Sequence, residues 1–192
     1  ISMYSVVPRV TKQVFRDPSA WYHFVVAYDT TQASADNRVK LYVNGEQVTS
    51  FTTNGTIPTD TLIAFTKQSQ AMYIGTASDE ATYFDGYITE YNLIDGQQLA
   101  PTSFGEYNKD TGVWQPKKYN GSYGTNGFYL KGRGTDNSGN GNNFTENNID
   151  TSSGDATYDL MSDVPTLTDE DTNNFATLNP NNMATLQWLT ET

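Results

Sequence analysis

Apolar and polar residues alternate with a period of two along much of the chain, whereas helical periodicity is weak. The clearest alternation covers residues 38–43, and residues 46–51 continue it after the pair Asn44-Gly45. This pair tolerates the positive φ angles that a two-residue type I′ turn requires. The pattern therefore predicts a β-hairpin centred on this turn.

Other segments are rich in β-branched and aromatic residues, and turn residues separate them. The further strands that we expect are residues 21–28, 62–65, 72–75, 83–94, 127–131 and 143–149. A short helix is expected at residues 99–105. Many short strands and almost no helix indicate an all-β fold, either a two-sheet sandwich or a jelly roll.

The charge divides the chain into two parts. Residues 1–133 hold 12 acidic and 11 basic residues, whereas residues 134–192 hold 10 acidic residues and no basic one. We expect a jelly-roll domain over residues 1–150 and an acidic extension over residues 151–192. The extension is either a solvated tail or a strap that docks on the domain or on a neighbouring subunit. Its apolar side chains favour a strap; they are Tyr158, Leu160, Met161, Phe175, Leu178, Leu186, Trp188 and Leu189.

Composition excludes several classes of function. The chain has no cysteine, which excludes disulfides, thiolate nucleophiles and the common zinc sites. It has one histidine, His23, which excludes metal sites built from several histidines. The net charge of −11 argues against nucleic acid and anionic membranes as partners. No apolar run is long enough for membrane insertion as a helix.

Four segments resemble the laminin G-like branch of the concanavalin A-like lectin/glucanase superfamily. The family's Trp-x-His strand and its hairpin ending in Tyr-Val-Asn-Gly are similar to WYHFVVAYD and RVKLYVNGEQV. The next strands are similar to YIGTASDEATYFDGYITEYNLID, and a family loop is similar to TDNSGNGNNFT. The resemblance implies a concanavalin A-like jelly-roll sandwich. Family domains carry several strands before the Trp-x-His strand, and only twenty residues precede Trp21, so we expect the N-terminal strands to be truncated.

Longer stretches resemble large bacteriophage virion proteins, many from marine phages. They are VFRDPSAWYHFVVAYDTTQASADNRVKLYVNG, IDGQQLAPTSFGEYNKDTGVWQPKKYNGSYGTNGFYL and NNFATLNP, and the similarity runs over residues 14–180. This resemblance implies a component of a tail fibre, a head fibre or a capsid decoration at the virion surface. Its partners would be other virion proteins and copies of itself.

The superfamily includes glycosidases, which need two carboxylates across the scissile bond. In jelly-roll enzymes these carboxylates lie at alternate positions of one strand. Asp85 and Glu90 are five residues apart, so a regular strand would point them to opposite faces. Asp79 and Glu80 are adjacent, and His23 lies in an apolar strand without a nucleophile motif. We therefore expect no enzymatic activity and a structural role for His23.

One loop has the spacing of a calcium site. Asp136, Ser138 and Asn140 occupy alternate positions and Gly141 follows, as in the first half of a calcium-binding loop. The twelfth position is Asn147 instead of the glutamate of an EF-hand. The loop is either a calcium site on a β scaffold or a turn held by Asx hydrogen bonds.

Aromatic residues in Gly-, Asn- and Ser-rich segments are candidates for stacking on sugars. The candidates are Tyr83, Tyr107, Trp114, Tyr119 and Tyr123. The alternative is that these rings pack the long loops onto the sandwich. We thus expect a non-enzymatic virion structural protein, with host-surface polysaccharide as its candidate ligand. A stand-alone carbohydrate-binding module of a secreted protein, and a glycosidase-like domain without the usual carboxylate pair, stay open as alternatives.

Overall fold

The computed structural model describes most of the chain up to residue 149 and one residue of the acidic extension. The described residues are 2–3, 9–17, 19–60, 72–76, 83–147, 149 and 167. The strand expected at residues 62–65 lies outside them, as does nearly all of the extension over residues 151–192.

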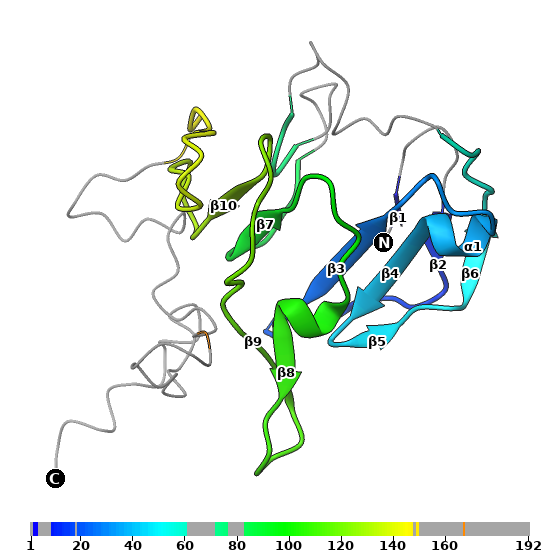
Figure 1. Ribbon diagram of the computed structural model, residues 1–192. Coiled ribbons are helices and arrows are strands. Elements are labelled where there is room, and N and C mark those ends of the chain that lie inside the picture. Colours follow the sequence, from blue (N-terminus) through cyan, green and yellow to red (C-terminus); the bar gives the residue numbers. More distant parts are fainter. Residues whose placement is uncertain are drawn as a thin grey trace, which may run out of the picture.

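The expected hairpin belongs to a three-stranded sheet (Figure 1). Strand β4 (Val39–Val43) pairs with β3 (Phe24–Tyr28) on one side and with β5 (Glu46–Gln47) on the other. Asn44 and Gly45 have φ angles of 48° and 84°, which confirms the type I′ turn. Every second residue of β4 is buried, as the alternation predicts. The five-residue strand β3 is shorter than the expected span of residues 21–28.

The strand expected over residues 46–51 is confirmed only for its first two residues, because two sheets share this segment. Strand β5 ends at Gln47, and β6 (Phe51–Asn54) instead pairs with β2 (Arg9–Thr11). The backbone amide of Lys12 donates to the carbonyl of Ser50 at 3.2 Å, so the change of sheet is complete at residue 50. Strand β1 (Ser2–Met3) pairs with the other edge of β2.

A third sheet joins β7 (Tyr91–Leu93) to β10 (Phe128–Leu130), as expected for residues 127–131. Of the long strand expected over residues 83–94, only β7 is confirmed. Glu90 has a φ of 54°, in the left-handed region that ends a strand, and only β7 follows it. Tyr83 forms an isolated bridge with Thr76.

Two other expected strands are corrected as well. Residues 72–75 form no strand, and Gly75 has a φ of 84°. The described residues between 143 and 149 form none either. The backbone amides of Asn143 and Phe144 instead donate to the carbonyls of Gly141 and Gly134, and the side-chain oxygen of Asn143 accepts from the amide of Asp136.

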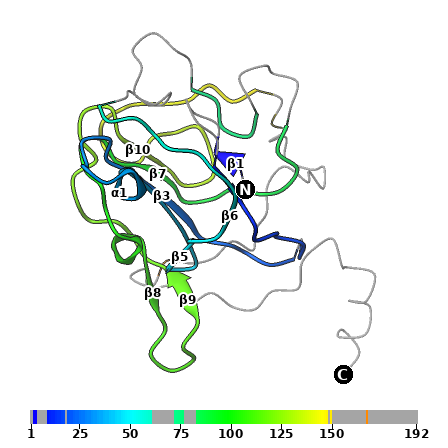
Figure 2. The same cartoon turned by 90° about the vertical axis from the view of Figure 1, so that its right-hand side faces the viewer.

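A projecting hairpin was not expected from the sequence. It consists of β8 (Gly105–Tyr107) and β9 (Trp114–Pro116), and Figures 1 and 2 show its turn pointing away from the other sheets. The expected helix over residues 99–105 is a single 3₁₀ turn, η2 (Pro101–Ser103). One helical turn, α1 (Ala35–Arg38), was missed. The described residues are thus all-β, and none of their helices is long and apolar enough to cross a membrane.

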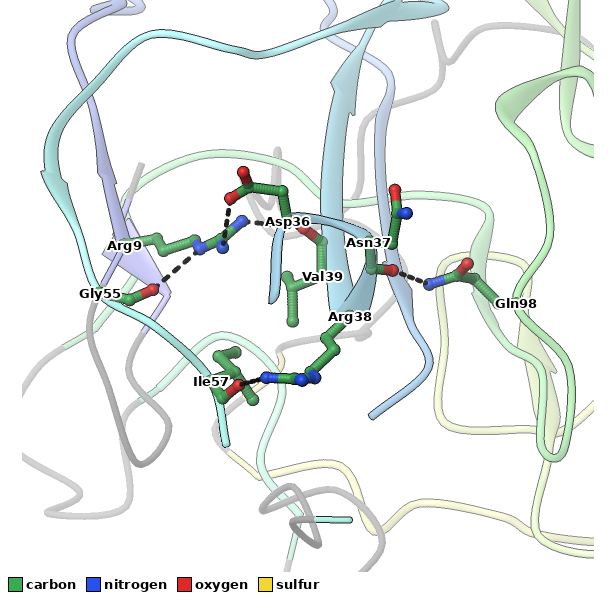
Figure 3. Close-up of polar contacts among 8 residues, drawn as sticks. All are labelled: Arg9, Asp36, Asn37, Arg38, Val39, Gly55, Ile57 and Gln98. Atoms are coloured by element: carbon green, nitrogen blue, oxygen red, sulfur yellow. Dashed lines mark hydrogen bonds and ion pairs between the residues drawn. The ribbon is translucent and has the colours of Figure 1, made fainter. Parts of the chain in front are cut away.

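Two arginines are buried beside β4 (Figure 3). The guanidinium of Arg38, 8% exposed, donates to the carbonyls of Gln32, Ala33 and Ile57 at 2.7–2.8 Å. It therefore satisfies carbonyls that no strand reaches.

Arg9 does the same between two sheets. It is 5% exposed and donates to the carbonyls of Val39 at 2.9 Å and Gly55 at 3.2 Å. Its other nitrogen lies 3.5 Å from the carboxylate of Asp36, and its guanidinium covers the ring of Phe51. Arg9 thereby joins β2 to the start of β4.

Candidate functional site

The structure separates the five candidate sugar-stacking residues. Tyr107 and Trp114 contact each other on the β8–β9 hairpin, with ring centroids 5.0 Å apart. Tyr119 and Tyr123 contact each other in the segment before β10, at 5.2 Å. Tyr83 lies at the bridge to Thr76 and is 70% exposed.

Trp114 has a packing role. Its indole N–H donates to Nδ1 of His23 at 3.0 Å, and its ring lies so close to Gly45 that a Cβ there would be 2.5 Å away. The hydroxyl of Tyr107 donates to Glu46 at 2.5 Å. These contacts pack the hairpin against the β4–β5 turn. Tyr107 and Trp114 therefore have the packing role that was the alternative to stacking on sugars.

His23 is neutral in this arrangement, because Nδ1 accepts a hydrogen bond and cannot carry a proton there. Burial lowers the pKa of His23. Its backbone exchanges hydrogen bonds with Asn44, so the histidine also supports the turn. The contacts agree with the structural role that we expected for His23.

The second tyrosine pair is surrounded by fixed polar groups. Tyr123 donates its hydroxyl to the side-chain oxygen of Asn92 on β7 at 3.1 Å. Its ring stacks beside that of Tyr129 on β10, with centroids 6.3 Å apart, and meets Tyr119 edge-on at 89°. Tyr119 packs against Phe104. The two strands of the β7–β10 sheet and the end of the 3₁₀ turn therefore position the pair.

A carboxylate and an amide lie close to the same segment. Asp95 accepts hydrogen bonds from the backbone and the side chain of Asn126 at 3.1 and 2.9 Å. The backbone amide of Asp95 donates to the carbonyl of Tyr123 at 2.9 Å. We use the name tyrosine site for Asn92, Asp95, Tyr119, Tyr123 and Asn126.

The phenol of Tyr123 resists ionisation. Burial raises the pKa of Tyr123 to about 12, and the negative charges of Glu90 and Asp136 contribute to the rise. The hydroxyl therefore stays protonated at physiological pH and serves as a hydrogen-bond donor.

The loop that begins at Asp136 is hydrogen-bonded to the segment that carries the tyrosine site. One carboxylate oxygen of Asp136 accepts from the amides of Tyr129 and Ser138, and the other accepts from the amide of Asn142 and the hydroxyl of Ser138. Partial burial raises the pKa of Asp136, but these four hydrogen bonds outweigh it and lower the pKa to about 2. Each oxygen of the carboxylate thus accepts two hydrogen bonds from the protein.

Two asparagines of this loop hold the segment that follows Tyr123. The side-chain amide of Asn140 donates to the carbonyls of Gly124 and Gly127 at 2.6 and 2.8 Å, and Asn142 donates to Thr125 and Gly127. Asp136, Ser138 and Asn140 therefore form the Asx-bonded turn that was the alternative to a calcium site. Among the described residues no cluster of three His, Cys, Asp or Glu side chains is suited to a metal. Calcium binding by this loop stays a prediction.

Sequence analysis missed three members of the tyrosine site, Asn92, Asp95 and Asn126. Asn126 lies more than thirty positions after Asn92 and Asp95, so the three residues form no local motif. The only usable signal was that Asp95-Gly96 and Asn126-Gly127 are both turn pairs that border expected strands.

Comparison with known families agrees with this architecture. Residues 8–100 match the concanavalin A-like lectin/glucanases superfamily. The match covers β2 to β7 and ends just before η2, so it includes Asn92 and Asp95 but not the two tyrosines. The described residues, mostly strands with little helix, are consistent with an all-β fold of the concanavalin A-like type. No curated protein and no solved structure matches the chain.

Proposed function

We propose that this chain is a non-enzymatic, glycan-binding domain of a virion surface protein, and that the tyrosine site is where it contacts sugar. The observation that carries the proposal is the pairing of two tyrosine rings with side-chain amides and a carboxylate in fixed positions. Sugars present flat C–H faces to aromatic rings and hydroxyls to such polar groups. The matched superfamily includes lectins, which is consistent with this use of the fold.

The hydrogen bonds of the nearby carboxylates support the proposal of binding without hydrolysis. Glu90 accepts a hydrogen bond from the hydroxyl of Tyr129, Asp95 accepts from the side-chain amide of Asn126, and Asp136 accepts four hydrogen bonds. A glycosidase acid needs a raised pKa, whereas the pKa of Asp136 is lowered to about 2. These carboxylates support the site instead of providing an acid and nucleophile pair.

The virion context rests on the resemblance of the long stretches over residues 14–180 to phage structural proteins. A fibre or a capsid decoration presents many copies of one domain to a cell surface. Sites with millimolar affinity then act together, because the effective concentration of a second site is high once the first is bound. The proposed partners are therefore other virion proteins, copies of this chain and a cell-surface polysaccharide.

The test is a glycan array followed by titration of the best oligosaccharide into the purified chain. We expect saturable binding that falls about tenfold in Tyr119→Ala, the effect of losing roughly 1.4 kcal/mol of ring contact. Tyr119→Phe keeps the ring and should keep most of the affinity. Tyr107→Ala, on the β8–β9 hairpin, is the matched control and should bind as the unaltered chain does.

Two results would contradict the proposal. Binding that is lost in Tyr107→Ala but kept in Tyr119→Ala would move the site to the hairpin. Release of reducing ends from the bound polysaccharide would make the domain a glycosidase.

A further inference from the structure

The β8–β9 hairpin contacts the β4–β5 turn through one of its two faces. Directly paired residues of antiparallel strands point to the same face, so Tyr107 and Trp114 share a face of the hairpin. Tyr107 donates to Glu46, and Trp114 packs on Gly45. The turn of the hairpin points away from the other sheets (Figures 1 and 2), so these two rings connect a projecting element to the sheet behind it.

Two glycines make room for the indole of Trp114. A Cβ at Gly45 would lie 2.5 Å from the ring, and a Cβ at Gly105 would lie 2.6 Å from it. Gly45 belongs to the β4–β5 turn and Gly105 belongs to β8. The indole therefore fills the space between the two elements and is in tight contact with the backbone of each.

The polar atom of this indole has a titratable partner. Nε1–H of Trp114 donates to Nδ1 of His23 at 3.0 Å, and the backbone of His23 exchanges two hydrogen bonds of 2.8 Å with Asn44. A protonated imidazole carries hydrogen on both nitrogens, so Nδ1–H would then face the indole N–H. Neither donor would have an acceptor, and a half-buried group without its partner is costly. The contact therefore requires the neutral histidine.

Other charges on the two contacting elements do not oppose this requirement. Glu46 and Tyr107 are the titratable groups near the contact, and they bind each other. Glu106 and Lys117 form an ion pair of 3.8 Å, and Glu106 lies on the opposite face of the hairpin because it adjoins Tyr107 in β8. Burial lowers the pKa of His23, which also favours the neutral form in the docked hairpin.

We propose that the hydrogen bond between Trp114 and His23 is a pH-sensitive switch, and that protonation of His23 releases the β8–β9 hairpin from the β4–β5 turn while the sheets stay folded. Release returns the imidazole to water, where histidine has its ordinary pKa of about 6.5. The docked hairpin binds the proton more weakly. The ratio of released to docked hairpin therefore rises about tenfold for each pH unit below about 6.5, until the pKa of the docked state is reached.

Hydrogen exchange of the indole N–H of Trp114 measures this release, even when the released state is rare. It is followed by nuclear magnetic resonance in the full chain, and protection is the exchange rate of free tryptophan divided by that of the protein at the same pH. We expect the protection of Trp114 to fall about tenfold between pH 7.5 and 5.5. At each pH it should stay well below the protection of the β4 amides, because those require global unfolding.

His23→Asn is the matched variant, because its amide oxygen takes the place of Nδ1 and does not titrate. It should keep the protection of Trp114 at pH 7.5 and abolish the fall. His23→Gln, a second acceptor that does not titrate, replaces it if His23→Asn does not give the circular dichroism of the unaltered chain. Tyr107→Phe removes the bond to Glu46 and should leave the fall in place.

Three results would overturn the proposal. The first is a constant protection of Trp114 between pH 7.5 and 5.5 in the unaltered chain. The second is an equal fall in the histidine variant, which would assign the pH dependence to a carboxylate such as Glu46. The third is a protection of Trp114 equal to that of the β4 amides, which would make the release a part of global unfolding.

Discussion

The region around β4 and the region around β10 both have short strands, but they hold their remaining backbone groups by different means. Around β4, two buried arginines donate to carbonyls from five different residues. Around β10, neutral asparagines donate to backbone carbonyls and one carboxylate accepts from backbone amides. These side chains lie closer to solvent than the arginines do.

This difference predicts how much stability each region loses when a side-chain donor is removed. A buried guanidinium leaves several desolvated carbonyls unpaired when it is removed, which is costly. An exposed amide leaves carbonyls that water can reach. The first region is therefore suited to be a rigid scaffold, and the second is suited to carry a variable surface such as the tyrosine site.

The largest effect is expected from Arg38→Met. The substitution keeps most of the volume but leaves the buried carbonyl of Ile57 and two neighbours without a donor, so we expect a loss of about 3 kcal/mol or more in the free energy of unfolding. Urea denaturation measures it. Arg133→Met, which removes an exposed ion pair with Glu146, is the matched control and should cause a much smaller loss. Equal losses in the two variants would remove the contrast between the regions.

Asp136→Asn is expected to have a medium effect. The amide offers one acceptor oxygen where the carboxylate offers two, so two donors lose their acceptor at a cost of about 1–2 kcal/mol at pH 6, reduced by partial exposure. The folded pKa of about 2 lies below the unfolded value, so the contribution of Asp136 is complete above about pH 4 and is lost as pH falls toward 2. The stability difference between the two proteins should therefore shrink over that range.

Denaturation at pH 6, 4, 3 and 2 follows this loss. Asp110→Asn, at an exposed position of the β8–β9 turn, is the control and should show no such difference. A difference that stays constant from pH 6 to 2 would mean that the carboxylate charge is not what holds the loop.

Protonation of His23 should have a smaller effect on stability, at a higher pH than that of Asp136. Burial lowers its folded pKa below the unfolded value, so the unfolded chain binds a proton first as pH falls. Stability should decrease as pH falls below about 6.5, the unfolded pKa of histidine. Because the chain has one histidine, His23→Gln should abolish this slope, and tryptophan fluorescence should report the unfolding. A slope that persists in His23→Gln would assign it to carboxylates.

The smallest effect is expected from Tyr107→Phe. The lost hydrogen bond to Glu46 is exposed to solvent, so thermal denaturation should find the melting temperature unchanged within error. A clear decrease would mean that the hairpin contributes more to the fold than its exposed position indicates.

Local patterns predicted the fold where local physics decides it. The alternation of β4 and the Asn44-Gly45 turn were predicted correctly because burial and turn geometry depend on neighbouring residues. The exchange of β6 into another sheet and the left-handed Glu90 were not, because both depend on pairing with distant segments. The tyrosine site was half predicted: the rings were chosen by composition, but Asn92 and Asp95 come from another strand and its following turn.

The most direct measurement is a nuclear magnetic resonance titration of the labelled full chain with the oligosaccharide that binds best. Shifts and line broadening concentrated on Tyr119, Tyr123, Asn126 and Asn92, with the sugar intact afterwards, are the predicted result. Shifts concentrated on the β8–β9 hairpin around Tyr107 and Trp114, or signals of a cleaved sugar, would contradict a binding site at the tyrosine pair.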